Sequence, residues 1–99
     1  MYARVMTSQS PKEKLDELNK RLAESTWPST KKQKGYKGYL ALSNPQTGER
    51  IVITLWDTEA DMLASEKASY FTQVTSQANL AASDTKITGP KHFAVSIKD

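Results

Sequence analysis

The fold is decided by residues 50–57, which read RIVITLWD. β-Branched and aromatic residues dominate this run, as is typical of a β-strand. Side chains alternate along a strand, so one side would carry Ile51, Ile53 and Leu55, and the other Val52, Thr54 and Trp56. A strand with one side in water should alternate apolar with polar residues, and this one does not. We therefore expect both faces of its sheet to be covered.

A second strand is predicted directly before it, at residues 36–43. Alternation would place Tyr36, Leu40 and Leu42 on one face, and Tyr39 and Ala41 on the other. The intervening residues 44–48, NPQTG, are typical of a hairpin loop. The two strands should therefore pair with each other, and residues 2–7 have the composition of a further strand.

A helix is predicted to follow the first strand, with Ser10 as its cap, Pro11 in the first turn and Glu13 reaching back. Its apolar stripe is formed by Leu15, Leu18 and Leu22. Pro28 disfavours helical geometry in the residue before it, so we expect the helix to end near residues 25–28.

A second helix is predicted from Thr58, whose hydroxyl can cap the amide of Asp61. A kink or short break is expected at residues 66–69. The apolar stripe of this helix is intermittent and consists of Leu63, Tyr70, Phe71, Val74, Ala78 and Ala81. Gly89-Pro90 is expected in a loop, and residues 92–98 alternate as a last strand.

The order strand, helix, strand, strand, helix, strand predicts an α+β fold: a ferredoxin-like β-α-β-β-α-β domain over residues 1–99, with a four-stranded antiparallel sheet. Both helices would cover one face and leave the other open. An exposed apolar sheet face usually marks an interface, so we expect a homodimer. The alternative is a monomer whose open face is less apolar than this register suggests.

Composition narrows the chemistry. The 99 residues include no cysteine and a single histidine, which excludes disulfides, thiolate metal sites and paired-imidazole sites within one chain. We expect no metal. No apolar run is long enough to span a membrane, and the first ten residues lack the apolar core of a signal peptide, so a cytoplasmic protein without membrane contact is the expectation.

The net charge of +3 is concentrated in Lys31, Lys32, Lys34 and Lys37. No nucleic-acid recognition motif accompanies these lysines, so a solvated loop is the favoured interpretation and no nucleic-acid partner is expected. A docking site for an acidic partner is the weaker alternative.

Residues 35–65, GYKGYLALSNPQTGERIVITLWDTEADMLAS, resemble the central segment of antibiotic-biosynthesis-monooxygenase-like proteins. The specific parts are the glycine-aromatic pair, the Thr-Gly hairpin and the strand ending in tryptophan before an acidic-capped helix. The resemblance implies a dimeric α+β barrel with a small-molecule pocket between sheet and helices. This family includes cofactor-independent oxygenases and haem-degrading enzymes. The haem degraders' histidine on the second helix and asparagine on the first strand are missing here, and so is the asparagine that the quinone-forming oxygenases use with their tryptophan. No cofactor is therefore expected.

Trp56 is the first candidate site residue, because the resemblance implies that this tryptophan lines the pocket. Its indole N–H could hold an anionic substrate oxygen, or it could bond a backbone carbonyl in an ordinary core. The remaining candidates for an aromatic wall are Tyr36, Tyr39, Tyr70 and Phe71, although such stripes also pack cores.

His92 is the candidate proton acceptor, with Tyr39 as a second catalytic group; an ordinary, partly exposed histidine is the alternative. Arg4 could bind an acidic substrate group, or pair with Asp57 or Glu49 as a structural contact.

Two functions remain open from the sequence. The first is a cofactor-independent monooxygenase that uses molecular oxygen on a small aromatic or polyketide-like anion. The second is a non-catalytic homodimeric module that binds a small ligand or a partner.

Overall fold

The computed structural model describes residues 1–68 and 86–99. Its centre is a four-stranded antiparallel sheet in the order β2-β3-β1-β4. The strands are β1 (Tyr2–Gln9), β2 (Tyr36–Ser43), β3 (Glu49–Trp56) and β4 (Lys86–Ala94). Tyr70 and Phe71, two of the aromatic candidates, lie outside the described residues.

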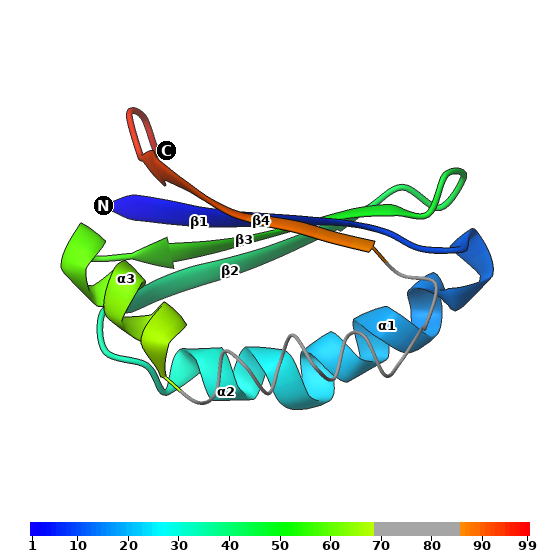
Figure 1. The fold of residues 1–99 in the computed structure, drawn as a ribbon, viewed down its shortest axis with the longest axis horizontal. Coiled ribbons are helices and arrows are strands. Elements are labelled where there is room, and N and C mark those ends of the chain that lie inside the picture. The colour runs from blue at the N-terminus through cyan, green and yellow to red at the C-terminus, as the bar shows by residue number, and fades with distance from the viewer. Residues whose placement is uncertain (69–85) are drawn as a thin grey trace.

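The described helices lie on one side of this sheet, below the strands in Figure 1. They form one long run after β1 and a separate helix after β3. The run comprises the 3-10 turn η1 (Lys12–Lys14), α1 (Leu15–Arg21), the π-helical turn η2 (Leu22–Thr26) and α2 (Trp27–Lys31), and the separate helix is α3 (Glu59–Lys67). This arrangement confirms the predicted ferredoxin-like α+β fold.

The first helical run begins later and ends later than predicted. Its N-cap is Pro11 rather than Ser10, and no side chain caps it there. Pro28 does not end the run, which continues to Lys31. The π-helical turn before Pro28 and the position of this proline in the first turn of α2 accommodate its missing N–H. The expected end at residues 25–28 is therefore wrong.

The second helix begins as predicted. The Thr58 hydroxyl accepts a hydrogen bond from the Asp61 amide at 3.0 Å. Helical geometry ends at Ala68, whose backbone is extended. This ending agrees with the break expected at residues 66–69.

β4 begins and ends earlier than predicted. The strand spans Lys86–Ala94, so Gly89-Pro90 lies inside it rather than in a loop. The register against β1 shifts between Val5 and Thr7, which is a β-bulge opposite these two residues. Gly89 adopts a φ of +116°, which the lack of a Cβ permits. Alternation alone could not reveal this bulge.

A second irregularity moves Tyr36 to the opposite face from the one predicted. The pairing of β2 with β3 shifts between Tyr36 and Gly38, so Tyr36 lies opposite Trp56 instead of sharing the face of Leu40 and Leu42. Its ring meets the indole edge-on, with 6.4 Å between the centroids. Tyr36 therefore belongs to the helix-facing side.

The register also decides which sheet face meets the helices. Arg4 reaches Ser65 on α3, and residues paired with Arg4 across the sheet share its face. That face carries Tyr39, Arg50, Thr54, Trp56 and His92. The opposite face carries aliphatic residues and remains largely uncovered, with Leu40, Leu42 and Phe93 exposed by 53, 44 and 52%.

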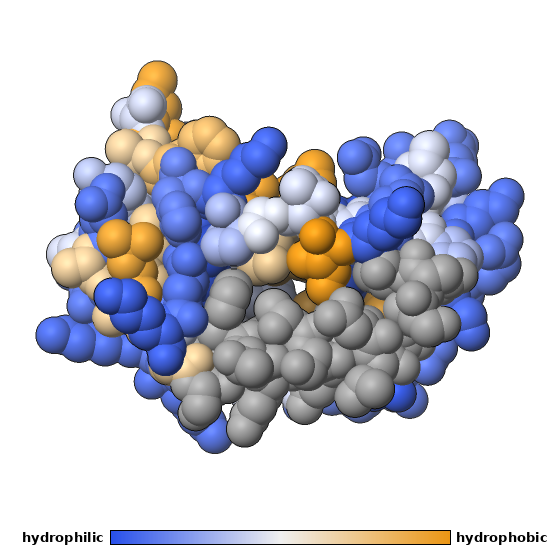
Figure 2. All heavy atoms as spheres, viewed as in Figure 1, coloured by the Kyte–Doolittle hydropathy of each residue, from blue (hydrophilic) through white to orange (hydrophobic). Residues whose placement is uncertain are grey.

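No described helix is long and apolar enough to cross a membrane. The surface seen in Figure 2 is mostly hydrophilic, with hydrophobic side chains gathered near the C-terminal segment at the upper left. Of the clustered lysines, Lys31 lies on α2 with its ammonium 4.6 Å from the ring centre of Trp27, and Lys34 is 4.0 Å from Asp61.

Candidate functional site

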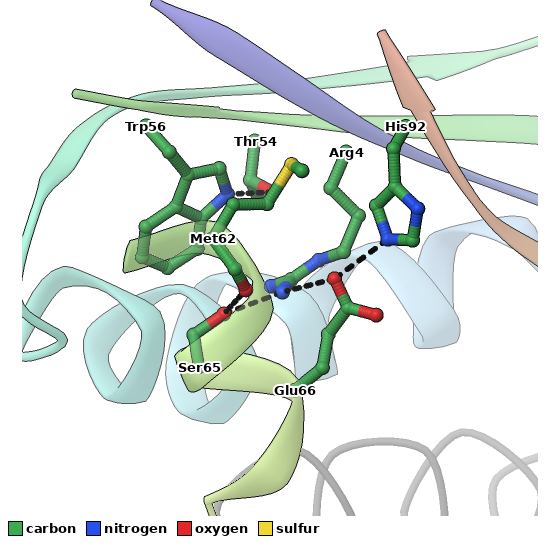
Figure 3. A network of polar contacts seen from close by, with 7 residues as sticks. All are labelled: Arg4, Thr54, Trp56, Met62, Ser65, Glu66 and His92. Carbon is green, nitrogen blue, oxygen red and sulfur yellow. Dashed lines mark hydrogen bonds and ion pairs between the residues drawn. The ribbon is translucent and has the colours of Figure 1, made fainter. Parts of the chain in front are cut away.

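A buried arginine organises the polar contacts beneath α3 (Figure 3). Arg4 extends from β1 and is only 3% exposed. Its Nη1 donates to Ser65 Oγ at 2.6 Å and lies 3.6 Å from Glu66 Oε2. Ser65 in turn donates to the Met62 carbonyl at 2.7 Å, which fixes the hydroxyl against the helix backbone. Arg4 thus contacts Ser65 and Glu66 on α3, rather than Asp57 or Glu49, which were the structural alternative to a substrate group.

The same carboxylate holds the only histidine of the chain. Glu66 Oε2 lies 2.8 Å from His92 Nε2, which reaches it from β4. An ionised carboxylate can only accept, so the hydrogen lies on Nε2 and Nδ1 is the nitrogen able to receive a proton. The His92 side chain is 35% exposed, against 15% for Glu66. This geometry suits a proton acceptor whose ring is oriented by Glu66 and which solvent can reach.

Trp56 lies beside this network and is fully buried. Its indole N–H donates to Thr54 Oγ1 at 2.9 Å, so the donor is engaged by a side-chain hydroxyl. The Arg4 guanidinium lies 5.0 Å from the ring centre, within cation–π range. Binding of a ligand by Trp56 stays a prediction, and these contacts make the indole a wall that Arg4 and Thr54 hold in place.

The other two described aromatic candidates, Tyr36 and Tyr39, have different neighbours. Tyr36 borders Trp56 and accepts a hydrogen bond at its hydroxyl from the Trp27 indole at 3.2 Å. Tyr39 is half-buried on the helix-facing side, opposite Thr54. The structure therefore brings Arg4, Trp56, Tyr36 and His92 to one end of the sheet. Residues that lie opposite one another on neighbouring strands form a row across the sheet, and Tyr39 lies in the same row as Thr54.

Beyond Thr54 the helix-facing surface becomes more open. Met6 and Ala41 flank Val52 in the next row of the sheet. Met6 and Val52 are half-buried and Ala41 is exposed, although this face is the one that carries the helices. Figure 2 shows a hollow near the middle of the face in view, with hydrophobic side chains beside it. Solvent thus reaches apolar side chains between the sheet and the helices.

The row after that contains a second buried arginine, Arg50, which sequence reasoning missed. It is 4% exposed and lies between Ser8 and Ser43 on the neighbouring strands. Burial lowers the pKa of the Arg50 guanidinium, and the charge interaction with Tyr39 raises it. The sequence carried no signal for this burial, because an arginine at the start of a strand can equally lie in solvent.

The amino-acid sequence matches a known protein family. A sequence profile described as antibiotic biosynthesis monooxygenase matches residues 1–76. The chain belongs to this family. The match ends before β4 begins, so His92 lies beyond the matched residues. No curated protein matches the chain.

Solved structures of low sequence identity share the fold. A candidate antibiotic biosynthesis monooxygenase from Deinococcus radiodurans superposes with a TM-score of 0.74 at 20% identity, covering 100% of this chain and 96% of that one. The haem degrader MhuD of Mycobacterium tuberculosis, solved with two haems in its active site, gives 0.74 at 18%, covering 100% and 99%. A candidate antibiotic biosynthesis monooxygenase from Nitrosomonas europaea gives 0.70 at 11%, covering 98% and 100%. At these identities the likeness concerns the fold alone.

Within the antibiotic biosynthesis monooxygenase family, haem ligation does not fit this chain. The single histidine lies on β4, and its Nε2 is engaged by Glu66. α3 carries no histidine that could serve as an axial ligand. Among residues 1–68 and 86–99, no three histidine, aspartate or glutamate residues gather as a metal site.

Sequence reasoning also missed Ser65 and Glu66. Both lie in the last turn of α3, and Glu66 falls within the segment where the sequence predicted a break. Neither residue belongs to a local sequence motif. Only the packing of α3 on β1 and β3 brings Ser65 and Glu66 to Arg4 and His92.

Proposed function

We propose that this chain is a cofactor-independent monooxygenase that acts on a small aromatic or polyketide-like anion bound between the sheet and the helices. The observation that carries the proposal is the Glu66–His92 pair. It leaves Nδ1 of a partly exposed imidazole able to accept a proton, on the same sheet face as Trp56 and Arg4. Membership of the antibiotic biosynthesis monooxygenase family supports the reaction class.

The reaction needs no external reductant. His92 removes a proton from an activated methylene carbon of the substrate, and Glu66 steadies the imidazolium that forms. The resulting carbanion reduces molecular oxygen and forms a C–O bond, giving a hydroperoxide. Loss of the second proton from that carbon breaks the O–O bond, so one oxygen atom becomes a ketone and the other leaves as water. Overall, CH₂ and O₂ become C=O and H₂O.

In this proposal Trp56 is the wall against which the aromatic substrate is oriented. The contacts of its ring with Arg4 and Tyr36 fix the plane of the indole. Tyr39 lies on β2 opposite Thr54 and faces the same side of the sheet. It is the second candidate for proton transfer. Arg4 acts as a positioning residue, because its guanidinium is already engaged by Ser65 and Glu66.

The test is oxygen uptake with polycyclic phenols that carry an activated methylene group. We expect turnover by the wild type and loss of turnover, with binding retained, in His92→Ala. Lys91→Ala is the matched control, because it removes an exposed side chain from the adjacent position of the same strand. Equal turnover by His92→Ala and the wild type would refute the role of His92.

The alternative is a non-catalytic module that binds a small ligand. It is favoured by the complete burial of Trp56 and by its engaged indole N–H. Melting the protein with phenolic anions and quinones separates the two functions, since a ligand that binds the native state raises the melting temperature. Stabilisation without oxygen consumption would support the module, and loss of that stabilisation in Trp56→Phe would place the ligand against the indole.

We further propose that two copies pair through the open sheet face. Leu40, Leu42 and Phe93 lie on it with about half of their surface exposed, beside the half-buried Ile51 and Ile53. Closed two-fold pairing is the commonest way to cover such a face. Light scattering after size exclusion should give twice the chain mass for the wild type and the chain mass for Leu42→Lys. A monomeric wild type at micromolar concentration would refute the dimer.

A further inference from the structure

Arg50 lies on the helix-facing side of β3, one row of the sheet beyond Val52. The side chains opposite it on the neighbouring strands are Ser8 and Ser43, which carry no charge that could neutralise the guanidinium. α1 lies on the helix-facing side of this end of the sheet, where Asn19 donates to Ser43 Oγ at 3.1 Å. Arg50 is therefore buried beside small polar side chains, at the end of the sheet where α1 contacts Ser43.

The guanidinium of Arg50 lacks the partners that a buried cation requires. It is 4% exposed, yet its Nε and Nη1 find no hydrogen-bond acceptor in the described structure. No described carboxylate forms an ion pair with it either. Arg4 provides the internal comparison, because it is equally buried on the same face and is bonded to Ser65 and paired with Glu66.

An unsatisfied buried charge is costly, and proteins rarely keep one without a function. A second unsatisfied atom lies on α1, where the buried Asn19 Oδ1 is without a donor among residues 1–68 and 86–99. Two cationic donors and one amide acceptor, all free of bonds at the same end of the sheet, form a set that a ligand carrying both an anionic oxygen and a hydroxyl would satisfy.

We propose that Arg50 binds the anionic oxygen of a small aromatic ligand, a carboxylate or a phenolate, between β3 and α1. A guanidinium is the side chain best suited to such oxygens, because its donors lie in one plane. An anion site at Arg50 specifies a negative charge for the ligand in the proposed function. It rests on that function only in treating the bound anion as the substrate.

The position of the anion also sets the length of the ligand. Arg50 and Thr54 are four residues apart on β3, about 13 Å along the strand, and β4 with His92 lies two strands from β3, about 10 Å across the sheet. Thr54 lies opposite Arg4 on β1, and Arg4 lies opposite His92 on β4. The partly exposed apolar row of Met6, Val52 and Ala41 lies between the two ends. A ligand of fused rings would thus lie across this row, with its charged group at Arg50 and its reacting carbon toward His92.

The experiment compares 2-naphthoate with its neutral amide, 2-naphthamide, by calorimetry and thermal melting at fixed ionic strength. We expect the wild type to bind naphthoate, and Arg50→Met to lose about 10- to 100-fold in affinity, as for the removal of a charged hydrogen bond. Lys37→Met is the matched control, because it removes the same charge from an exposed position of β2 and should bind like the wild type.

The unliganded proteins give a second readout. A cation that serves only binding contributes nothing to folding, so Arg50→Met should melt at the same temperature as the wild type or higher. A lower melting temperature together with unchanged naphthoate affinity would assign Arg50 a structural role and overturn the proposal. If Arg50→Met does not fold, the wild type alone decides, because equal binding of naphthamide and naphthoate would also overturn it.

His92→Ala separates this inference from the proposed function. It should bind naphthoate like the wild type, since His92 lies at the other end of the helix-facing surface. Binding of the anion through Arg50 without oxygen uptake by any substrate would leave the anion site standing and refute the oxygenase. Oxygen uptake that is unaffected by Arg50→Met would support the oxygenase and refute the anion site at Arg50.

Discussion

Replacing Glu66 by glutamine tests the charge pairing beneath α3 while preserving the shape of the side chain. Glu66 lies 3.6 Å from the Arg4 guanidinium and 2.8 Å from His92. Glutamine retains an oxygen that can accept from His92, but it removes the negative charge facing Arg4. We expect Glu66→Gln to lower the free energy of unfolding, because Arg4 remains buried and charged without this carboxylate.

The magnitude follows from the geometry. Opposite charges 3.6 Å apart attract by about 5 kcal/mol at an effective dielectric constant of about 20. Part of this attraction is offset, because a neutral glutamine costs less to bury than a carboxylate. The Arg4 and Glu66 side chains are 4 and 15% exposed, so solvent screening is limited. We expect a net loss of about 2 kcal/mol, or about 8–16 °C in the melting temperature of a domain of this size.

The assay is urea denaturation of the wild type, Glu66→Gln, Arg4→Met and the double variant. In the Arg4→Met background, Glu66→Gln should cost less than about 0.5 kcal/mol, because the cation it pairs with has been removed. His92→Gln is the control for the exposed side of the network and should cost less than Glu66→Gln. A Glu66→Gln effect that is the same with and without Arg4 would refute the pairing.

Three further substitutions test the packing that positions this site. Met62→Ala should cost about 2–5 kcal/mol in urea denaturation, because Met62 is fully buried between α3 and the sheet; a loss below about 1 kcal/mol would contradict that burial. Thr58→Ala should cost about 1 kcal/mol in the same assay through loss of the cap on the Asp61 amide, whereas Thr58→Ser should cost little. Gly48→Ala should lower the melting temperature strongly, because φ at this position is +83° and an added Cβ would overlap the Ser10 carbonyl oxygen; an unchanged melting temperature would show that the turn relaxes.

The strands and the second helix start could be predicted because their signals are local. The apolar run around Val52 marks β3, and the turn residues before Gly48 mark the hairpin, in which Asn44 Oδ1 accepts from the amide of Gln46. The hydroxyl of Thr58 three residues before Asp61 is likewise a local pattern. Element order then restricts the topology to few possibilities, and the ferredoxin-like arrangement follows.

The errors occur where neighbouring strands or turns override a local rule. Pro28 lies inside a helical run because it follows a π-helical turn and stands in the first turn of α2, where no backbone N–H is required. Tyr36 changes face because of a shift in the pairing of β2 with β3. Gly89-Pro90 remains in β4 because a bulge against β1 absorbs it. Each of these depends on pairing or packing between segments that alternation within one segment does not contain.

The site was predictable in part. Arg4, Trp56 and His92 were identified by residue type, and the structure brings them to one end of the sheet. Their partners were not identified, because Glu66 comes from a helix end with no motif of its own. Arg50 was assigned only to a strand, since a single sequence does not indicate whether an arginine at a strand end lies in solvent or beneath a helix.

The two faces of the sheet reverse the usual assignment of polar and apolar residues. The face beneath the helices buries Arg4, Arg50 and Thr54, whereas the aliphatic face is the uncovered one. Buried cations add little to folding stability, and exposed aliphatic residues add less than they would in a core. A sheet arranged only for the stability of one chain would turn its aliphatic face toward the helices. The observed arrangement therefore favours a second chain on the aliphatic face and a ligand on the polar one.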